Sequence, residues 1–282
     1  MKVINESTVV VSTSSELKTA LEENNGYVYF YFDSDITLDA GIKIPSSKIN
    51  VTINGTYEGV RHTFTDKKSL SASDTISVSA GVLNVKACNM DVVGYNYYGL
   101  IYVPDSSSYK SVVVEYNNII YNGPQMAFNP YGLTRFTDCD VTISDGELVA
   151  GNEVAECNRI EIGGISNIVH NSKSNSAFWF RNSEPSLSIL SGAVVHFTSV
   201  NRELIYGTNS LSFSILSNGY FFVTTHNGMA YGSFGTGTTN IAANGEFILK
   251  QTGTNGSYAT WNSTGVITLN DNASLSIINN YS

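Results

Sequence analysis

The chain has 282 residues, only 14% of them charged, and its formal net charge is −9. An acidic surface argues against binding to nucleic acid and against charge-driven binding to anionic lipid. No apolar run is long enough to cross a membrane, and the abundance of Gly, Ser, Thr, Asn and Tyr is typical of a folded, β-rich protein.

One segment near the N-terminus has helical periodicity. In "TSSELKTALEENN", Leu17 and Leu21 lie on one helical face, and Thr13 and Glu16 have the spacing of a capping box. The "NNG" that ends this stretch is typical of a helix terminus. The sequence therefore predicts a helix over residues 13–25, and we expect it to cover the open apolar end of a stack of strands.

The next two segments alternate apolar and polar residues, as strands do: "YVYFYFDSDITL" and "KINVTINGTYEGVRHTFTD". With the preceding helix, the "DSDITL" strand and the "INGTYEGVRHTFTD" stretch, the chain resembles the pectate lyase-like adhesive domain of Gram-positive surface proteins. These motifs cover about residues 8–150, and the repeat architecture extends the resemblance over the rest. Many members have Asp-Gly where this chain has Asn54-Gly55.

The resemblance implies a right-handed parallel β-helix that is displayed on a bacterial cell wall, usually beside repeat modules and an anchoring signal. The chain starts at Met-Lys without a signal peptide and stops in a strand-like segment, "SLSIINNYS". We therefore expect residues 1–282 to be a single domain of a larger, extracellular, cell-wall-anchored protein, with the coils of the β-helix over residues 27–282.

Apolar side chains recur at a nearly constant spacing of about 26 residues, within the range of solenoid repeats. The series is Ile76, Tyr102, Phe128, Val154, Phe180, Tyr206, Tyr231 and Trp261, and only its last interval is clearly longer. Most of these residues follow another apolar residue two positions earlier, which is strand periodicity. Strands that return at such a period indicate a solenoid, and we expect these side chains to stack in one interior line.

A second register has a similar period. It runs through Ile162, Ile189, Ile215, Ile241 and Leu269, and Val85, Val114 and Ile143 extend the series backwards. Three residues after most of them stands Gly or Asn, and apolar residues return at the sixth and eighth positions. This pattern predicts a tight bend between two strands, with Asn218, Asn244 and Asn272 forming a ladder of hydrogen-bonded side chains.

The two registers together predict an all-β fold, a parallel β-helix of about ten coils with at least three short strands in each coil. Right-handedness follows the strong chirality of parallel crossover connections. A β-sandwich would instead place strands at an even spacing of about 8–12 residues. The three cysteines, Cys88, Cys139 and Cys157, are expected in the interior, and a Cys139–Cys157 disulfide is the alternative.

The densest group of carboxylates lies in and after "RFTDCDVTISDGE". If Cys139 and Ile160 point inward at the same level, Asp140 and Glu161 become outward neighbours on adjacent coils, and Asp138 lies beside Arg159. Such a group is a weak candidate for binding Ca²⁺. The alternative is a surface charge ladder that Arg135 and Arg159 partly neutralise. Outward positions of the later coils are Ser, Leu, Asn and Ala, which cannot transfer protons, and His170 falls on an interior position. We therefore predict no catalytic residue and no cofactor.

A binding surface is a better candidate than an active site. Strand alternation places Ile101, Glu153, Trp179, Arg181 and Ile205 on the outside of the coils, as a mixed apolar and charged strip. An exposed Trp beside an Arg has the composition of an interface hot spot. The alternative is that the variable loops fold over the strip. Tyrosines also concentrate over residues 95–131, where they suit either a sugar-binding face or the packing of bends.

Two functions from different classes remain. The first is a non-catalytic, monomeric adhesin domain that binds a host or extracellular-matrix glycan or protein along the flank of the β-helix. The second is a polysaccharide-degrading enzyme on the same fold, a lyase before a hydrolase. The sparse carboxylates favour the first, and a purely structural stalk would be its limiting case.

Overall fold

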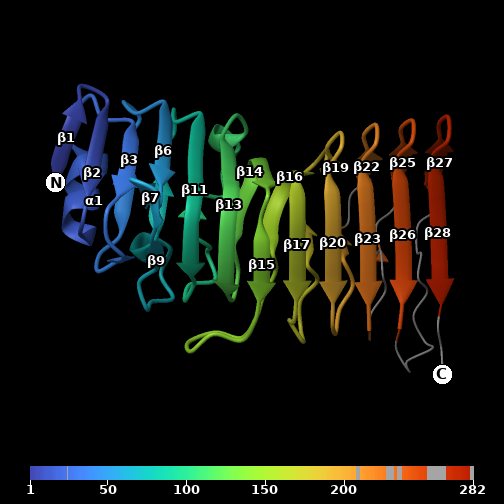
Figure 1. Ribbon diagram of the computed structural model, residues 1–282. Helices are drawn as coiled ribbons and strands as arrows, with labels where there is room; N and C mark the ends of the chain where they lie inside the picture. Colours follow the sequence, from blue (N-terminus) through green and yellow to red (C-terminus); the bar gives the residue numbers. More distant parts are fainter. Residues whose placement is uncertain (24, 208–209, 227–231, 234–236, 253–264, 280–282) are drawn as a thin grey trace.

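The computed structural model describes the chain except for residues 24, 208–209, 227–231, 234–236, 253–264 and 280–282. Parallel strands stack from one end of the molecule to the other, and the chain runs around them coil after coil (Figure 1). The predicted all-β parallel β-helix is confirmed. In the described part of the chain, no helix has the length and hydrophobicity needed to cross a bilayer.

The strands form three faces, and the first, which we call the A face, carries the candidate site. It consists of β5 (Ile42–Ile44), β10 (Ile76–Val78), β12 (Ile101–Tyr102), the start of β14 (Ala127–Thr137), the start of β16 (Ala155–Gly163), β18 (Phe178–Phe180), β21 (Ile205–Gly207) and β24 (Gly232–Ser233). These strands pair in parallel, and most are short because bends or loops interrupt them at both ends.

The B face follows the A face along each coil. It consists of β2 (Thr8–Val11), β3 (Tyr29–Phe32), β6 (Asn50–Asn54), the starts of β11 (Asn84–Val93) and β13 (Val113–Gly123), the ends of β14 and β16, β19 (Ser186–Ile189), β22 (Ser212–Ile215), β25 (Thr238–Ile241) and β27 (Val266–Leu269).

The C face completes each coil. It consists of β4 (Ile36–Thr37), β9 (Thr63–Thr65), the ends of β11 and β13, β15 (Asp140–Ile143), β17 (Ile165–His170), β20 (Val194–Ser199), β23 (Tyr220–Thr225), β26 (Glu246–Gln251) and β28 (Ser274–Asn279). The A face thus has eight strands among the described residues, and the solenoid has about eight turns rather than the predicted ten.

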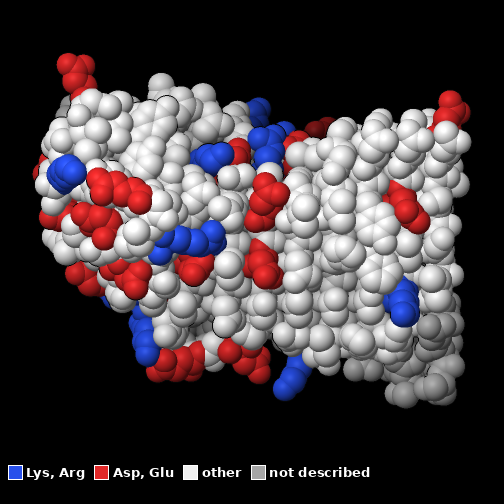
Figure 2. All heavy atoms as spheres, viewed as in Figure 1, with Lys and Arg blue, Asp and Glu red and all other residues white. Residues whose placement is uncertain are grey.

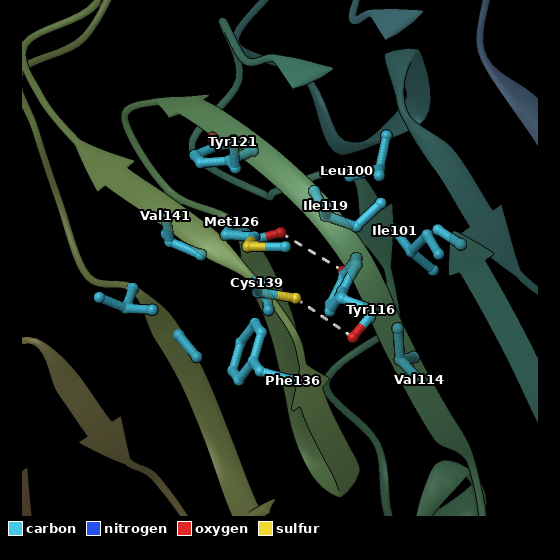
Figure 3. Close-up of a cluster of buried hydrophobic side chains, with 14 of the residues drawn as sticks. Leu100, Ile101, Val114, Tyr116, Ile119, Tyr121, Met126, Phe136, Cys139 and Val141 are labelled. Carbon is cyan, nitrogen blue, oxygen red and sulfur yellow. Dashed lines mark hydrogen bonds between the residues drawn. The ribbon is translucent and has the colours of Figure 1, made fainter. Parts of the chain in front are cut away.

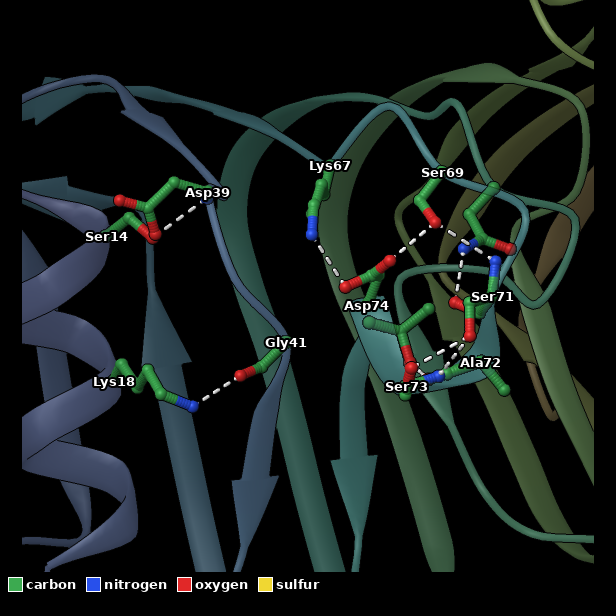
Figure 4. Close-up of polar contacts among 12 residues, drawn as sticks. Ser14, Lys18, Asp39, Gly41, Lys67, Ser69, Ser71, Ala72, Ser73 and Asp74 are labelled. Atoms are coloured by element: carbon green, nitrogen blue, oxygen red, sulfur yellow. Dashed lines mark hydrogen bonds and ion pairs between the residues drawn. The ribbon is translucent and has the colours of Figure 1, made fainter.

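The N-terminal end of the stack is closed. Helix α1 (Ser14–Glu22) is capped by Thr13, buries Leu17 and Leu21, and packs against β5. Ser14 bonds to Asp39 and Lys18 donates to the Gly41 carbonyl, which fastens the helix to the first coil (Figure 4). Strand β1 (Lys2–Asn5) covers the edge of β2 in antiparallel pairing. The cap helix is confirmed, but the solenoid begins before it, at β2, and not at residue 27.

Short elements decorate the coils between the faces. They are the antiparallel pair β7 (Thr56–Tyr57) and β8 (Val60–Arg61) and the 3-10 turns η1 (Ala72–Asp74) and η2 (Ser107–Tyr109). Turn η1 is held by a serine-rich network in which Lys67 and Ser69 both contact Asp74 (Figure 4). This network fixes the loop that leads into β10 of the A face.

The second register and its bends are confirmed. Ile162, Ile189, Ile215, Ile241 and Leu269 are direct partners on successive strands of the B face. Asn218, Asn244 and Asn272 adopt left-handed backbone at φ 59°, 57° and 56°. The amides of Asn244 and Asn272 each donate to the preceding Asn at 3.3 Å, as a ladder requires. The backward extension is wrong: Ile143 pairs with His170 on the C face. Val85 and Val114 align through Thr134 with Ile160 rather than with Ile162.

The single interior line predicted from the first register is wrong: three of its described members point outward, and the buried Val154 and Phe180 do not align with Ile76. Tyr102, Phe128 and Tyr206 point out of the coils, whereas Ile76, Val154 and Phe180 are buried. The interior line of the A face instead runs through Ile76, Ile101, Ala127, Ala155, Phe178 and Ile205. A constant spacing misses this alignment because the loops between A-face strands differ in length. Tyr231 and Trp261 lie outside the described residues.

Interior side chains fill the stack without a disulfide. Figure 3 shows the cluster around Tyr116, whose hydroxyl donates to the Met126 carbonyl at 3.3 Å, while the Cys139 thiol contacts the Tyr116 carbonyl at 3.3 Å. Cys88, Cys139 and Cys157 are all free and buried, so the alternative of a Cys139–Cys157 disulfide is wrong. Burial raises the pKa of the Cys139 thiol to about 11, which keeps it protonated and unreactive.

Charge is distributed unevenly along the axis. On the side seen in Figure 2, acidic and basic side chains gather over the N-terminal half, and the C-terminal half is nearly uncharged. The sequence agrees, since only one Lys and no Arg follows Arg202. Recognition by charge is therefore confined mainly to the N-terminal and central coils.

Candidate ligand-binding face

A column of side chains points outward from the middle of the A face. The column consists of direct partners on five successive strands, four aromatic residues and one glutamate: Tyr102, Phe128, Glu156, Trp179 and Tyr206. We call it the aromatic column. The column spans roughly 19 Å, because neighbouring strands lie about 4.8 Å apart. Its rings touch: the centroids of Tyr102 and Phe128 are 5.3 Å apart, and those of Trp179 and Tyr206 are 6.1 Å apart at 70°.

A loop adds aromatic rings to the N-terminal end of the column. The ring of Tyr98 lies 5.1 Å from that of Tyr102 and 5.4 Å from that of Phe128, so Phe128 is only 4% exposed. Buried Asp66 holds this loop, because its carboxylate accepts the backbone N–H groups of Tyr95 and Asn96. Burial raises the pKa of Asp66 to about 7.

Arg181 fixes the middle of the column. Its guanidinium lies 5.8 Å from the ring centre of Phe128 and 5.0 Å from that of Trp179, which are cation–π distances. The same group bonds to Glu156 at 2.7 Å and to Asp105 at 3.2 Å. Burial raises the pKa of the Glu156 carboxyl, and the hydrogen bond from Arg181 counters part of that rise.

Two hollows lie at the ends of the aromatic column. One, of about 330 Å³, is lined by Glu153, Ser174, Asn175, Ser176, Trp179, Arg202 and Tyr206. The other, of about 390 Å³, adjoins Tyr102, Tyr109 and Ser73 at the opposite end. The column therefore runs between two concave sites on one face.

Glu153 is the most unusual group of the first hollow. Its side chain is buried, with 4% exposure of the residue, and its Oε2 atom has no hydrogen-bond partner among the described residues. Burial raises the pKa of this carboxyl to about 8, and the neighbouring Glu156 adds to the rise. Glu153 is therefore mostly protonated at neutral pH.

The outward direction expected for the strip is found at two of its five positions. Trp179 points outward and is half-buried, and Arg181 lies beside it at the surface. Ile101 and Ile205 are wrong, because both are fully buried in the interior line of the A face. Glu153 lies beside Trp179, but it is buried rather than exposed. A role of these residues in binding stays a prediction.

Sequence reasoning missed four of the five members of the aromatic column, and Glu156 was not a candidate at all. Tyr102, Phe128 and Tyr206 were placed inside by the first register, whereas the strand pairing turns them outward. The alternation of Trp179 with its neighbours Phe178 and Phe180 is the one local signal that could have corrected the phase.

The candidate metal ligands do not come together. Asp138 sits in a left-handed bend at φ 53° and accepts the Ile165 N–H at 2.9 Å. This bend moves the chain from the B face to the C face, so Asp140 lies on the C face and Glu161 on the B face. Asp140 bonds to Asn167, and Glu161 bonds to Arg135 at 2.7 Å.

No group of three or more His, Cys, Asp or Glu side chains suited to a metal is found within the described part of the chain. The hypothesis of a Ca²⁺ site at these three carboxylates is therefore not supported by their geometry. Arg159, expected beside Asp138, instead donates to the Lys110 carbonyl.

The interior position of His170 is confirmed. Its Nδ1 lies 3.1 Å from the Ser199 hydroxyl and its Nε2 lies 2.9 Å from the Asn152 carbonyl. Burial lowers the pKa of this imidazole to about 4, so it is neutral at physiological pH. Through Asn152, which also bonds to Asn175, this imidazole is connected to the loop that lines the hollow at Glu153.

The fold and the aromatic column define a class of protein, a parallel β-solenoid with a candidate ligand-binding flank. Residues 8–128 match the family model described as "Putative pectate lyase-like adhesive domain", which confirms the predicted resemblance over that part of the chain.

Two solved structures of L. reuteri serine-rich repeat adhesins (SRRP) are similar over nearly the whole chain. For SRRP of L. reuteri 53608 the identity is 16% and the TM-score 0.57, with 96% of this chain and 99% of that chain covered. For SRRP of L. reuteri 100-23 the values are 16%, 0.55, 100% and 99%. At this identity the likeness is one of fold. No curated protein matches the chain.

Proposed function

We propose that this chain is a non-catalytic adhesin domain, displayed outside the bacterial cell, that binds a host or extracellular-matrix glycan or protein along its A face. The observation that carries the proposal is the aromatic column with Arg181 held against it. The family match over residues 8–128 supports the adhesive class. We expect the domain to act as a monomer.

The geometry of the A face suits an extended ligand. Half-buried aromatic rings with polar edges offer apolar area at a low entropic cost, and they pack against sugar faces or peptide side chains. Parallel strands hold the column in fixed register, so a polymer that lies along it would meet Tyr102, Trp179 and Tyr206, while Phe128 and Glu156 lie beneath the surface. Arg181, Glu156 and Asp105 add a rigid polar group at the centre.

A screen of the isolated domain against a glycan array and a panel of extracellular-matrix proteins tests the proposal. We expect Trp179→Ala and Tyr102→Ala to weaken binding to whatever the screen finds by about 2 kcal/mol or more. The matched control is Tyr220→Ala, since Tyr220 also points outward but lies on the C face. Binding that survives both A-face changes, or that the control abolishes, would contradict the assignment of the face.

One observation favours the second candidate, a polysaccharide-degrading enzyme. Glu153 and Glu156 are neighbouring carboxyls whose pKa values are both raised, and glycoside hydrolases use a pair of carboxyl groups as acid and base or nucleophile. Glu156 is, however, engaged by Arg181 and Gln125. We therefore rank binding above catalysis, and an assay for cleavage decides between them.

A further inference from the structure

The hollow at the C-terminal end of the aromatic column, which Glu153, Trp179 and Tyr206 line, is a concave site rather than a flat surface. We propose that it is a subsite for one uncharged sugar residue, which packs against Trp179 and Tyr206 and exchanges hydrogen bonds with the carboxyl group of Glu153. This inference rests on the proposed function and names the class of ligand that the A face takes.

Size and walls fit a single ring. The hollow of about 330 Å³ is at the small end of the range of ligand pockets, which begins near 300 Å³. Trp179 and Tyr206 meet edge to face at its side, and Tyr206 keeps 46% exposure, so its ring is open to a ligand. Ser174 and Asn175 add small polar groups to the lining.

Glu153 supplies the reason to expect hydroxyl groups in the ligand. A buried polar atom without a partner costs free energy, and Glu153 Oε2 is such an atom in a residue that lines a cavity. Because this carboxyl is mostly protonated at neutral pH, it can both donate and accept a hydrogen bond. A sugar hydroxyl offers both roles. Because the Oε2 atom itself is closed to solvent, the carboxyl group must rotate toward the hollow to reach that hydroxyl.

The surrounding charges favour an uncharged ligand. Arg202 lines the hollow, but its guanidinium is paired with Glu203 at 3.2 Å. Arg181 is likewise paired, with Glu156 and Asp105. An acidic sugar would therefore meet only ion-paired cations, and an amino sugar would meet the Arg202 guanidinium in the lining of the hollow. A neutral pyranose avoids both costs.

The wall of the hollow is anchored before any ligand arrives. Ser176 donates to Glu203 at 2.8 Å, and Asn175 bonds to Asn152. Ser172 accepts the backbone N–H groups of Ser174 and Asn175 at 3.3 and 3.0 Å. A preformed wall lowers the entropic cost of binding a small ligand.

Saturation-transfer NMR with the methyl glycosides of glucose, galactose, mannose and N-acetylglucosamine tests the subsite, with glucosamine and glucuronate as charged probes. At least one neutral glycoside should bind the intact domain more tightly than either charged probe. Trp179→Ala and Glu153→Ala should weaken that binding at least about tenfold, as loss of a hot-spot contact does. Glu153→Gln, which keeps a neutral polar group, should stay within about threefold.

Tyr220→Ala is the control, and thermal unfolding checks that each variant folds. Should Glu153→Ala fail to fold, Tyr206→Ala takes its place, because Tyr206 is exposed and contributes little to the core. Preference for a charged probe, no glycoside binding, or binding unchanged in the Trp179 and Glu153 variants overturns the subsite.

These failures are separable from failure of the proposed function. A polymer that depends on Tyr102 while no glycoside binds would leave the adhesin face standing and remove the subsite. A glycoside that depends on Trp179 and Glu153, without any ligand in the wider screen, would support the subsite and count against the extended face.

Discussion

The guanidinium of Arg181 lies 5.0 Å from the centre of the Trp179 ring, and this contact connects the exposed surface to a buried carboxyl. Through Glu156, Arg181 reaches Gln125, and Gln125 in turn bonds to Asn152 behind the hollow. The orientation of Trp179 is therefore set by a polar network rather than by packing alone.

Arg181→Ala should destabilise the domain by about 1–3 kcal/mol, because it removes a charge-assisted hydrogen bond and leaves Glu156 buried without a cation. Urea unfolding measures the loss. The matched variant Arg181→Ala with Glu156→Gln should recover part of it, since no charge is then left unpaired. If the double variant is no more stable than Arg181→Ala, the pair does not act as described.

Phe180→Ala should cost about 3–5 kcal/mol, because Phe180 is buried in the stack and its loss leaves a cavity. Tyr206→Ala, a change of similar size on the outer side, should cost well under about 1 kcal/mol in the absence of ligand. The two free energies of unfolding, measured under the same conditions, report the phase of the A face. Equal losses would contradict the corrected register.

Glu153→Gln should change how stability depends on pH. Burial raises the pKa of Glu153 from 4.5 to about 8 in the folded state, so the folded protein binds the extra proton between these values. That contribution is fully present below pH 4.5 and is lost as the pH rises through about 8. The Gln variant has no proton to lose at this position. Its free energy of unfolding relative to the wild type, measured by thermal unfolding, should therefore rise between pH 4.5 and about 8. A constant difference would mean that the carboxyl is not desolvated.

Asn244→Ala should cost about 1–2 kcal/mol, because alanine is strained in the left-handed backbone that Asn244 adopts at φ 57°. Asn244→Gly removes the strain and loses only the ladder bonds to its two neighbours. Chemical denaturation of both variants separates backbone strain from side-chain pairing. Equal costs for Ala and Gly would assign the whole effect to the ladder.

The purified domain with Ca²⁺ should neither form unsaturated products from pectins and other uronic-acid polymers nor release reducing ends. The physical reason is that Asp138, Asp140 and Glu161 do not converge and that Glu156 is engaged by Arg181. Absorbance and reducing-sugar assays over a pH series check this. If the domain cleaved a polymer and Glu153→Gln abolished that cleavage, the domain would be a polysaccharide-degrading enzyme rather than a non-catalytic adhesin.

The sequence predicts the bends of this fold better than its faces. Asn218, Asn244 and Asn272 are correctly placed because the bend between the B and C faces has a fixed length, so local spacing fixes the alignment. The A-face strands follow loops of unequal length. The chain is longer between Phe128 and its partner Glu156 than between Glu156 and its next partner, Trp179. No fixed period can follow such steps.

The candidate site was accessible to sequence reasoning only where it is local. Trp179 and Arg181 alternate with Phe180 in and just after one strand, so their outward direction could be read directly. Ile101 and Ile205 were wrong because their phase had to be carried across loops. The hollow at Glu153 arises where a loop around Asn175 meets the next coil, a contact that no sequence period encodes.

The coils are stacked along one axis, with β1 and β2 at one end and β27 and β28 at the other (Figure 1). Tension applied between the two ends therefore pulls along the backbone hydrogen bonds that join successive strands, and it opens them one coil at a time rather than shearing many at once. Each released coil would lengthen the chain by roughly 90 Å, the reach of its extended backbone. If the domain binds through its A face as proposed, end coils would open and dissipate mechanical load before the central strands are disturbed.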